Sequence, residues 1–115
     1  MNNDNKAIIN EIVSKVASAA KLSLGDRLDK VILYGSYARG DNNEESDIDI
    51  FILADIPCVE RGHERSKIRA ILGNIDLDYD IVLSLKVADR ETFNKFLPVE
   101  PFYKRVMQDG VVISA

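Results

Sequence analysis

The chain has 115 residues, of which 46% are hydrophobic, so it is long enough for one folded domain and too apolar for a disordered one. Its 15 basic and 19 acidic residues give a net charge of −4, which disfavours nucleic acid as a partner because non-specific binding needs Lys and Arg at the phosphates. The single cysteine, Cys58, excludes an internal disulfide, and a single histidine, His63, disfavours a zinc site. We therefore expect one domain over residues 1–115.

The sequence predicts neither a membrane span nor a signal peptide. Its apolar runs are shorter than the ~18 residues that a membrane-spanning helix needs. The first residues after Met1 are polar, and the segment lacks the basic stretch and apolar core of a signal peptide. Together with the absence of an internal disulfide, these features predict a cytoplasmic protein.

The first half of the chain is predicted to hold one long helix and two strands. Apolar residues recur at spacings of three and four over residues 4–22, which is typical of an amphipathic helix that covers a core. Residues 30–34 are mostly β-branched or aromatic and predict a buried strand, followed by a turn into a short helix at residues 36–40. A polar loop over residues 41–45 leads to a second predicted strand at residues 47–54.

A second long helix is predicted over residues 59–72, followed by a third strand over residues 77–83. The apolar side chains that we expect on the inner face of this helix are Ile68, Ile71 and Leu72. The side chains that we expect in solvent are Glu60, Arg61, Glu64, Arg65 and Lys67.

Shorter elements complete the chain. The acidic residues that begin at Asp89 suit the first turn of a helix that ends near Phe96. A last helix over residues 100–108 is expected to pack Phe102 against the core, together with Val106, and a small edge strand follows it. The alternation of strands and helices predicts an α/β or α+β domain built on a small sheet.

Two short motifs beside the predicted strands indicate a chemical site. They are Gly35-Ser36 and Asp47-x-Asp49, with ten residues between Ser36 and Asp47. Glycine lets the backbone approach a phosphate closely, and a helix that begins at Ser36 offers free N–H groups to that phosphate. Asp47 and Asp49 project from one face of a strand, which places both carboxylates where they can bind Mg²⁺.

A third carboxylate is expected from the next strand. Asp76, Asp78 and Asp80 share one parity, so periodicity alone does not choose among them. Asp80 is favoured because it precedes the apolar run over residues 81–83, and Asp78 could be an outer partner.

Arg39 follows the Gly-Ser turn and has two interpretations. Its guanidinium could contact a phosphate, or it could form a structural ion pair with Asp41 or Asp47. Both interpretations place Arg39 beside the predicted site.

The segments Gly35-Ser36-Tyr37-Ala38-Arg39-Gly40 and Ser46-Asp47-Ile48-Asp49 resemble the signature of the polymerase-β-type nucleotidyltransferase superfamily. More narrowly, they resemble the minimal nucleotidyltransferase (MNT) proteins, which are the antitoxins of HEPN/MNT toxin–antitoxin pairs. Tyr79-Asp80-Ile81-Val82 resembles the third-strand motif of that group, which implies that Asp80 is the third metal ligand. The resemblance covers nearly the whole chain and implies a small mixed sheet with helices packed mainly on one face.

The resemblance also implies a reaction, in which an acceptor hydroxyl attacks the α-phosphorus of ATP and pyrophosphate leaves. Asp47 and Asp49 would hold two Mg²⁺ ions, and Asp80 would complete one of them or take the proton of the acceptor. Gly35-Ser36 would cradle the outer phosphates. The acceptor would be a tyrosine of a HEPN-type toxin, so the implied activity is protein AMPylation.

Two alternatives compete with this function. The chain could be an antitoxin that neutralises its partner by covering it, since it is small and lacks a separate substrate domain. It could also transfer nucleotides to a small molecule or an RNA end, with an acceptor site completed by an oligomer or another subunit. The net negative charge disfavours RNA as that acceptor.

Overall fold

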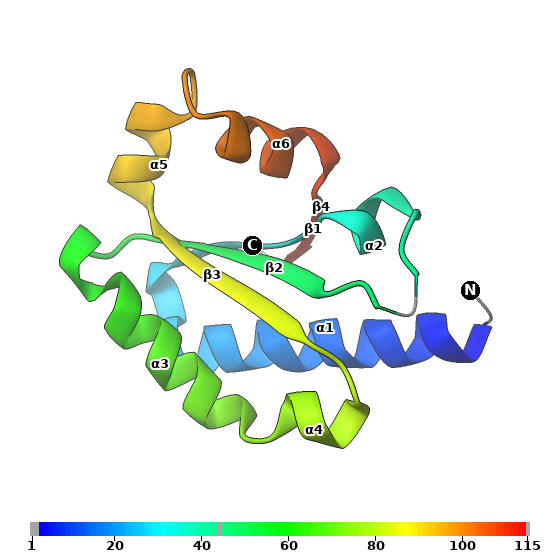
Figure 1. Ribbon diagram of the computed structural model, residues 1–115. Helices are drawn as coiled ribbons and strands as arrows, with labels where there is room; N and C mark the ends of the chain where they lie inside the picture. The colour runs from blue at the N-terminus through cyan, green and yellow to red at the C-terminus, as the bar shows by residue number, and fades with distance from the viewer. Residues whose placement is uncertain (1–2, 44, 115) are drawn as a thin grey trace.

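The computed structural model describes residues 3–43 and 45–114. The strands are β1 (Leu28–Tyr34), β2 (Ile48–Ala54), β3 (Leu83–Asp89) and β4 (Val111–Ser114). The helices are α1 (Asn3–Leu24), α2 (Ser36–Arg39), α3 (Arg61–Leu72), α4 (Ile75–Tyr79), α5 (Arg90–Phe96) and α6 (Pro101–Asp109), with 3-10 turns at Gly25–Arg27 and Cys58–Glu60. The four strands form one sheet in the order β3-β2-β1-β4, in which only the β2–β3 pair is parallel (Figure 1). This mixed sheet confirms the predicted fold class.

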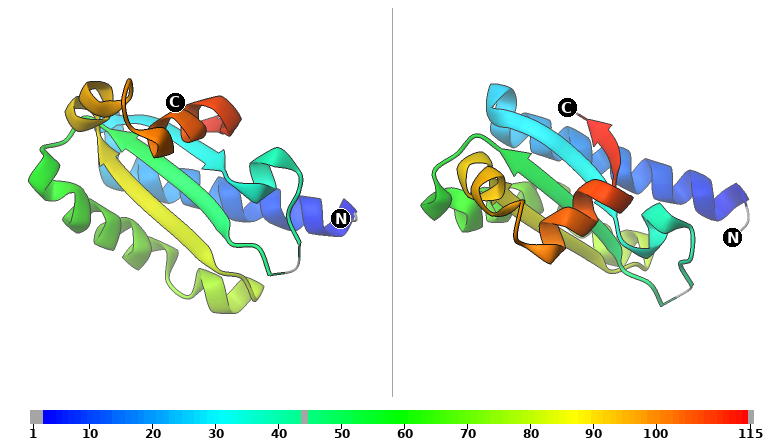
Figure 2. Two further views of the ribbon diagram at one scale, coloured as in Figure 1. Left: turned by 45° about the horizontal axis from the view of Figure 1, so that its top comes forward. Right: turned by 90° about the horizontal axis from the view of Figure 1, so that it is seen from above.

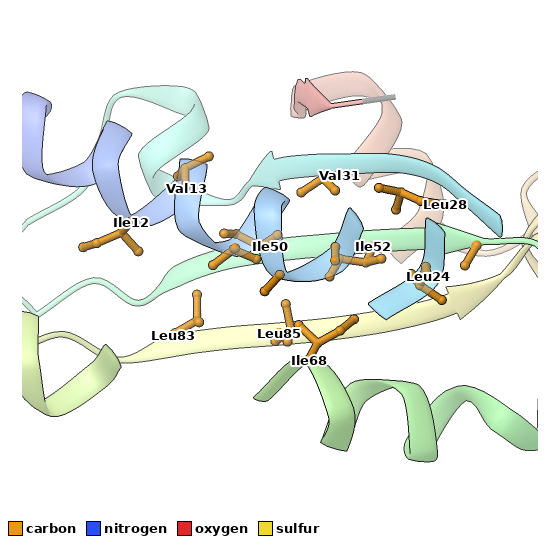
Figure 3. Close-up of a cluster of buried hydrophobic side chains, with 14 of the residues drawn as sticks. Ile12, Val13, Leu24, Leu28, Val31, Ile50, Ile52, Ile68, Leu83 and Leu85 are labelled. Atoms are coloured by element: carbon orange, nitrogen blue, oxygen red, sulfur yellow. The ribbon is translucent and has the colours of Figure 1, made fainter. Parts of the chain in front are cut away.

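The larger core lies between the sheet and the long helices α1 and α3 (Figure 3). The alternation predicted for β2 is confirmed, because Ile48, Ile50 and Ile52 are all fully buried on this face. Ile12 from α1 and Ile68 from α3 pack against the same face. Each fully buried aliphatic side chain stabilises the fold by roughly 1.5–3 kcal/mol relative to an exposed one, so this face supplies much of the stability.

The opposite face of the sheet carries an aromatic cluster, partly covered by α5 and α6 (Figure 2). Phe51 of β2 lies at its centre, and the ring centroids of Phe93 and Tyr103 are 5.0 Å apart. Phe102 packs on Tyr34 with a centroid separation of 5.6 Å. The predicted packing of the last helix through Phe102 and Val106 is therefore confirmed.

The third strand was predicted too early in the chain. Residues 75–79 form α4, and the strand begins at Leu83. The carboxylate of Asp76 explains this change, because it accepts hydrogen bonds from the Leu83 N–H at 2.9 Å and from Arg69 at 2.7 Å. These bonds hold α4 beside the first residue of β3. Asp80 ends α4 in the left-handed conformation, with φ of 53°.

The solvent-facing side predicted for α3 is wrong at one position. Glu64 is buried, with only 3% of its surface exposed. Its carboxylate accepts a hydrogen bond from the Ser23 hydroxyl at 3.2 Å and lies 3.5 Å from Arg27 and 3.6 Å from Lys67. A buried carboxylate needs such partners, and here they connect α1 to α3. Ile71, expected in the core, is 45% exposed.

Over the part of the chain that the structure describes, no helix is both long enough and apolar enough to cross a bilayer.

Gly110 provides a test of how α6 joins β4. A Cβ atom at this position would lie 2.2 Å from the Val106 carbonyl oxygen and 2.4 Å from the Ile32 side chain. We expect Gly110→Ala to destabilise the protein by about 1–3 kcal/mol, because a backbone carbonyl and a core side chain must shift. The free energy of unfolding in urea measures this loss.

Gly62→Ala is the matched control, because a Cβ atom there meets nothing within 4 Å. Gly62 lies in the first turn of α3, so alanine should stabilise the helix slightly, by less than about 1 kcal/mol. Equal unfolding free energies for the two variants would contradict the packing described for Gly110.

Candidate active site

Gly35 joins β1 to α2 and lies directly against the carboxylate of Asp49. Its φ of 76° and ψ of −155° belong to a conformation that side chains rarely adopt. A Cβ atom at Gly35 would lie 2.3 Å from Asp49 Oδ2, which is far inside van der Waals contact. The residue must therefore be glycine for two independent reasons, one conformational and one steric.

Asp49 lies in the middle of the sheet, because β2 has a neighbour on each side. It pairs with Tyr34 on β1 and with Ser84 on β3. Its side chain points to the face that carries Phe51, away from the buried isoleucines, as the alternation predicted. Asp47 precedes the strand by one residue and is exposed.

Asp47 lies close enough to Asp49 for its charge to affect the pKa of Asp49. Burial raises the pKa of Asp49, and the negative charge of Asp47 raises it further. A hydrogen bond from Ser84 and the charge of Arg39 lower the pKa, but the net direction is upward. A cation bound between two close carboxylates relieves their repulsion. Mg²⁺ suits this position because it prefers hard oxygen ligands such as carboxylates.

Tyr34 on β1 is the other ladder partner of Asp49. Burial, together with the charge of Asp49, raises the pKa of Tyr34 to about 12, so its phenol is protonated at neutral pH. The ring also packs edge-on against Phe102. Tyr34 therefore joins the carboxylate site to the aromatic cluster under α6.

The short helix α2 begins at Ser36, directly after the glycine that contacts the Asp49 carboxylate. The first backbone bond of the turn runs from the Arg39 N–H to the Gly35 carbonyl at 3.1 Å, so the preceding N–H groups have no partner within the helix. Gly40 closes the turn in the left-handed conformation, with φ of 82°. Such N–H groups can bind an anion, as predicted for Ser36.

Arg39 pairs with Asp41 at 3.2 Å, which is one of the partners considered from the sequence. Both side chains are exposed, and an exposed pair contributes only about 0–1 kcal/mol to stability. The guanidinium can therefore exchange Asp41 for a phosphate at little cost.

The structure places Asp80 at the end of α4, before β3. Asp80 is exposed after α4 instead of lying inside a strand, so the argument from an apolar strand context is wrong. Within residues 3–43 and 45–114, no three carboxylate, imidazole or thiolate groups converge as a metal site. Asp78 is likewise exposed on α4.

Ser84 is the neighbour of Asp49 that sequence reasoning missed. The third strand was placed six residues too early, so residue 84 fell outside it. The signal was present in the alternation of buried Leu83 and Leu85 with more polar Ser84 and Lys86.

Comparison with known protein sequences identifies related chains. The family model described as "Nucleotidyltransferase domain" matches residues 10–113. The Methanocaldococcus jannaschii protein named "Putative protein adenylyltransferase MJ0604" is 34% identical over 111 residues, which are 96% of this chain and 98% of that protein. "Putative protein adenylyltransferase MJ0141" of the same organism is 44% identical over 75 residues, or 64% of this chain and 73% of that protein.

Solved structures share the fold. A crystal structure described as a toxin–antitoxin with AMP-PNP aligns with a TM-score of 0.54 at 20% identity, over 90% of this chain and 73% of the other. A variant of the toxin–antitoxin MntA-HpeT aligns with a TM-score of 0.50, also at 20% identity, over 99% of this chain and 74% of the other. At this identity the likeness concerns the fold alone.

Proposed function

This chain belongs to the nucleotidyltransferase domain family, as its motifs predicted, and on that premise we propose that it transfers AMP from ATP to a hydroxyl of a partner protein. The observation that carries the proposal is the close approach of Gly35 to Asp49 under the start of α2. This contact places the Asp49 carboxylate beside the first residues of α2. The protein adenylyltransferase names of two relatives support a protein acceptor.

Asp47 and Asp49 are the residues that would hold Mg²⁺. They fit this ion because they offer hard oxygen donors on one face, and because burial and mutual repulsion raise the pKa of Asp49. Bound there, Mg²⁺ would supply a positive charge that offsets the charge developing on the reacting phosphate.

The other residues of the site would bind and orient the nucleotide. The first N–H groups of α2 and the Ser36 hydroxyl would bind the outer phosphates, and Arg39 would contact them from the surface. The acceptor oxygen then forms a bond to the α-phosphorus as the bond to pyrophosphate breaks. The hydroxyl proton passes to solvent, which is accessible beside the exposed Asp47.

The partner that we propose is a HEPN-type toxin, with this chain as its antitoxin. Two observations support a partner of this class: the sequence motifs resemble the MNT antitoxins, and the fold matches chains from toxin–antitoxin structures. The structure with AMP-PNP further supports an adenine nucleotide as the donor.

Transfer of radiolabel tests this proposal directly. Incubation with Mg²⁺, [α-³²P]ATP and the protein encoded by the neighbouring gene should label that partner. Asp47→Ala combined with Asp49→Ala should remove the label, because both proposed metal ligands are lost. If the wild-type protein transfers no label from any nucleotide although it is folded, the proposal is wrong.

A cell-survival assay separates catalysis from simple covering of the partner. Cells that express the toxin should survive with the wild-type chain and die with the double variant. Equal protection by both would favour the non-catalytic antitoxin. That alternative is motivated by the small size of the chain.

A further inference from the structure

Ser84 on β3 lies opposite Asp49, the carboxylate that binds the metal in our proposed function. Asp49 pairs with Ser84 in the parallel β2–β3 ladder, and the next pair on the same face is Phe51 with Lys86. Paired side chains on neighbouring strands lie about 5 Å apart, so Ser84 is within reach of the carboxylate. A third acidic ligand from β3 would have to occupy one of these two positions.

No carboxylate occupies that face of β3. From the start of the strand, its three positions are Ser84, Lys86 and Ala88. The strand's acidic residue, Asp89, is buried at the far end, where it accepts a hydrogen bond from the Thr92 N–H at 2.9 Å and caps α5. Asp89 therefore has a structural role as the cap of α5.

Ser84 is the ladder partner of Asp49 on the same face of the sheet, so its hydroxyl is placed to donate to the carboxylate, and this contribution lowers the pKa of Asp49. A hydroxyl has one proton to donate, and an ionised carboxylate can only accept. On the β1 side, the same carboxylate is confined by Gly35, where there is no room for a side chain. Asp49 therefore has a close neighbour on each side.

We propose that Ser84 is a positioning residue, whose hydroxyl holds the Asp49 carboxylate in the orientation that binds the cation. This inference rests on the proposed function, because it concerns the same metal site. It gives Ser84, the β3 partner of Asp49, a role that the sequence did not predict. Partners that orient a metal ligand typically change metal affinity 10–100-fold when they are removed.

Mn²⁺ binding in the presence of AMP-PNP tests this role without relying on turnover. Electron paramagnetic resonance reports the free Mn²⁺, and the same titration without protein corrects for the Mn²⁺ that AMP-PNP binds alone, so the difference gives the dissociation constant of the protein. We expect Ser84→Ala to weaken Mn²⁺ binding by at least about 10-fold. Ser84→Thr keeps the hydroxyl and suits a strand, so it should bind within about threefold of wild type.

Ser66→Ala is the matched control, since Ser66 is exposed on α3, which packs on the face of the sheet opposite the one that carries Asp49 and Phe51. Thermal melting of all four proteins shows whether each is folded at the assay temperature. Mn²⁺ binding by Ser84→Ala that equals wild type would overturn the role of Ser84 and leave the proposed function intact. Equal weakening by the alanine and threonine variants would also overturn it, because the hydroxyl would then be irrelevant.

A wild-type protein that binds no Mn²⁺ with AMP-PNP would overturn the proposed function itself, and the inference about Ser84 with it. The two failures are therefore distinguishable in a single experiment.

Discussion

Replacing Gly35 with alanine should abolish nucleotidyl transfer while the protein stays folded. The new methyl group would lie 2.3 Å from Asp49 Oδ2, so the carboxylate must move by about an ångström to accommodate it. A displacement of that size at a reacting centre lowers rates by about 100-fold or more. Transfer of label from [α-³²P]ATP to the partner protein measures the loss.

The same substitution also affects stability, because Gly35 has a positive φ. An L-residue in such a conformation costs about 1–2 kcal/mol. Gly73→Ala separates the two effects, since Gly73 has φ of 60° but nothing within 4 Å of its Cβ position. It lies after α3, outside the site, and should lose comparable stability without losing transfer. If both variants retained equal activity when folded, the steric argument for Gly35 would be wrong.

The sequence was sufficient to predict the features that depend on local pattern. The turn at Gly35 and the same-face placement of Asp49 and Phe51 follow from residue type and a period of two. What local pattern could not show is the contact between Gly35 and Asp49, which are fourteen positions apart in the chain. That contact arises because Tyr34 pairs with Asp49 in the β1–β2 ladder.

The third strand shows where local pattern fails. Aspartates at positions 76, 78 and 80 alternate with Ile75, Leu77 and Tyr79, which imitates the period of a strand. The segment is nevertheless helical, because Asp76 bonds to Leu83 and to Arg69 of α3. Arg69 is seven positions before Asp76 and Leu83 is seven positions after it. Periodicity within a short segment does not predict contacts at that separation.

Glu64 illustrates the same limit for charge. A glutamate on an amphipathic helix is normally in solvent, and the sequence offers no reason to expect otherwise. Its burial follows from the packing of α3 against α1, which brings Ser23 and Arg27 to its carboxylate. Tertiary partners therefore decided the position of both misplaced carboxylates, Glu64 and Asp80.

Asp49→Asn should change activity and stability in opposite directions. Activity should fall by at least about 100-fold, because removing one proposed metal ligand forfeits several kcal/mol of charge stabilisation in the transition state. The metal-free protein should become more stable at neutral pH. Burial and the charge of Asp47 disfavour the ionised Asp49, as its raised pKa indicates, and asparagine removes that charge.

The sign of the pH dependence follows from the same raised pKa. A carboxyl whose pKa is higher in the folded than in the unfolded state destabilises the fold when it is ionised in both states. This penalty is present at neutral pH and disappears as the pH falls through the raised pKa towards the ordinary value of 3.8. The stability advantage of the asparagine variant should therefore shrink as the solution becomes acidic.

Mg²⁺ should reverse the order of stability at neutral pH. In the proposed function the ion would bind between Asp47 and Asp49 in the folded state and relieve their repulsion, so it should raise the melting temperature of the wild-type protein. The Asp49→Asn protein lacks one ligand and should respond much less. Asp26→Asn, an exposed position outside the site, is the matched control and should respond like wild type. A variant that melts at the wild-type temperature with and without Mg²⁺ would show that Asp49 neither carries this strain nor binds the ion.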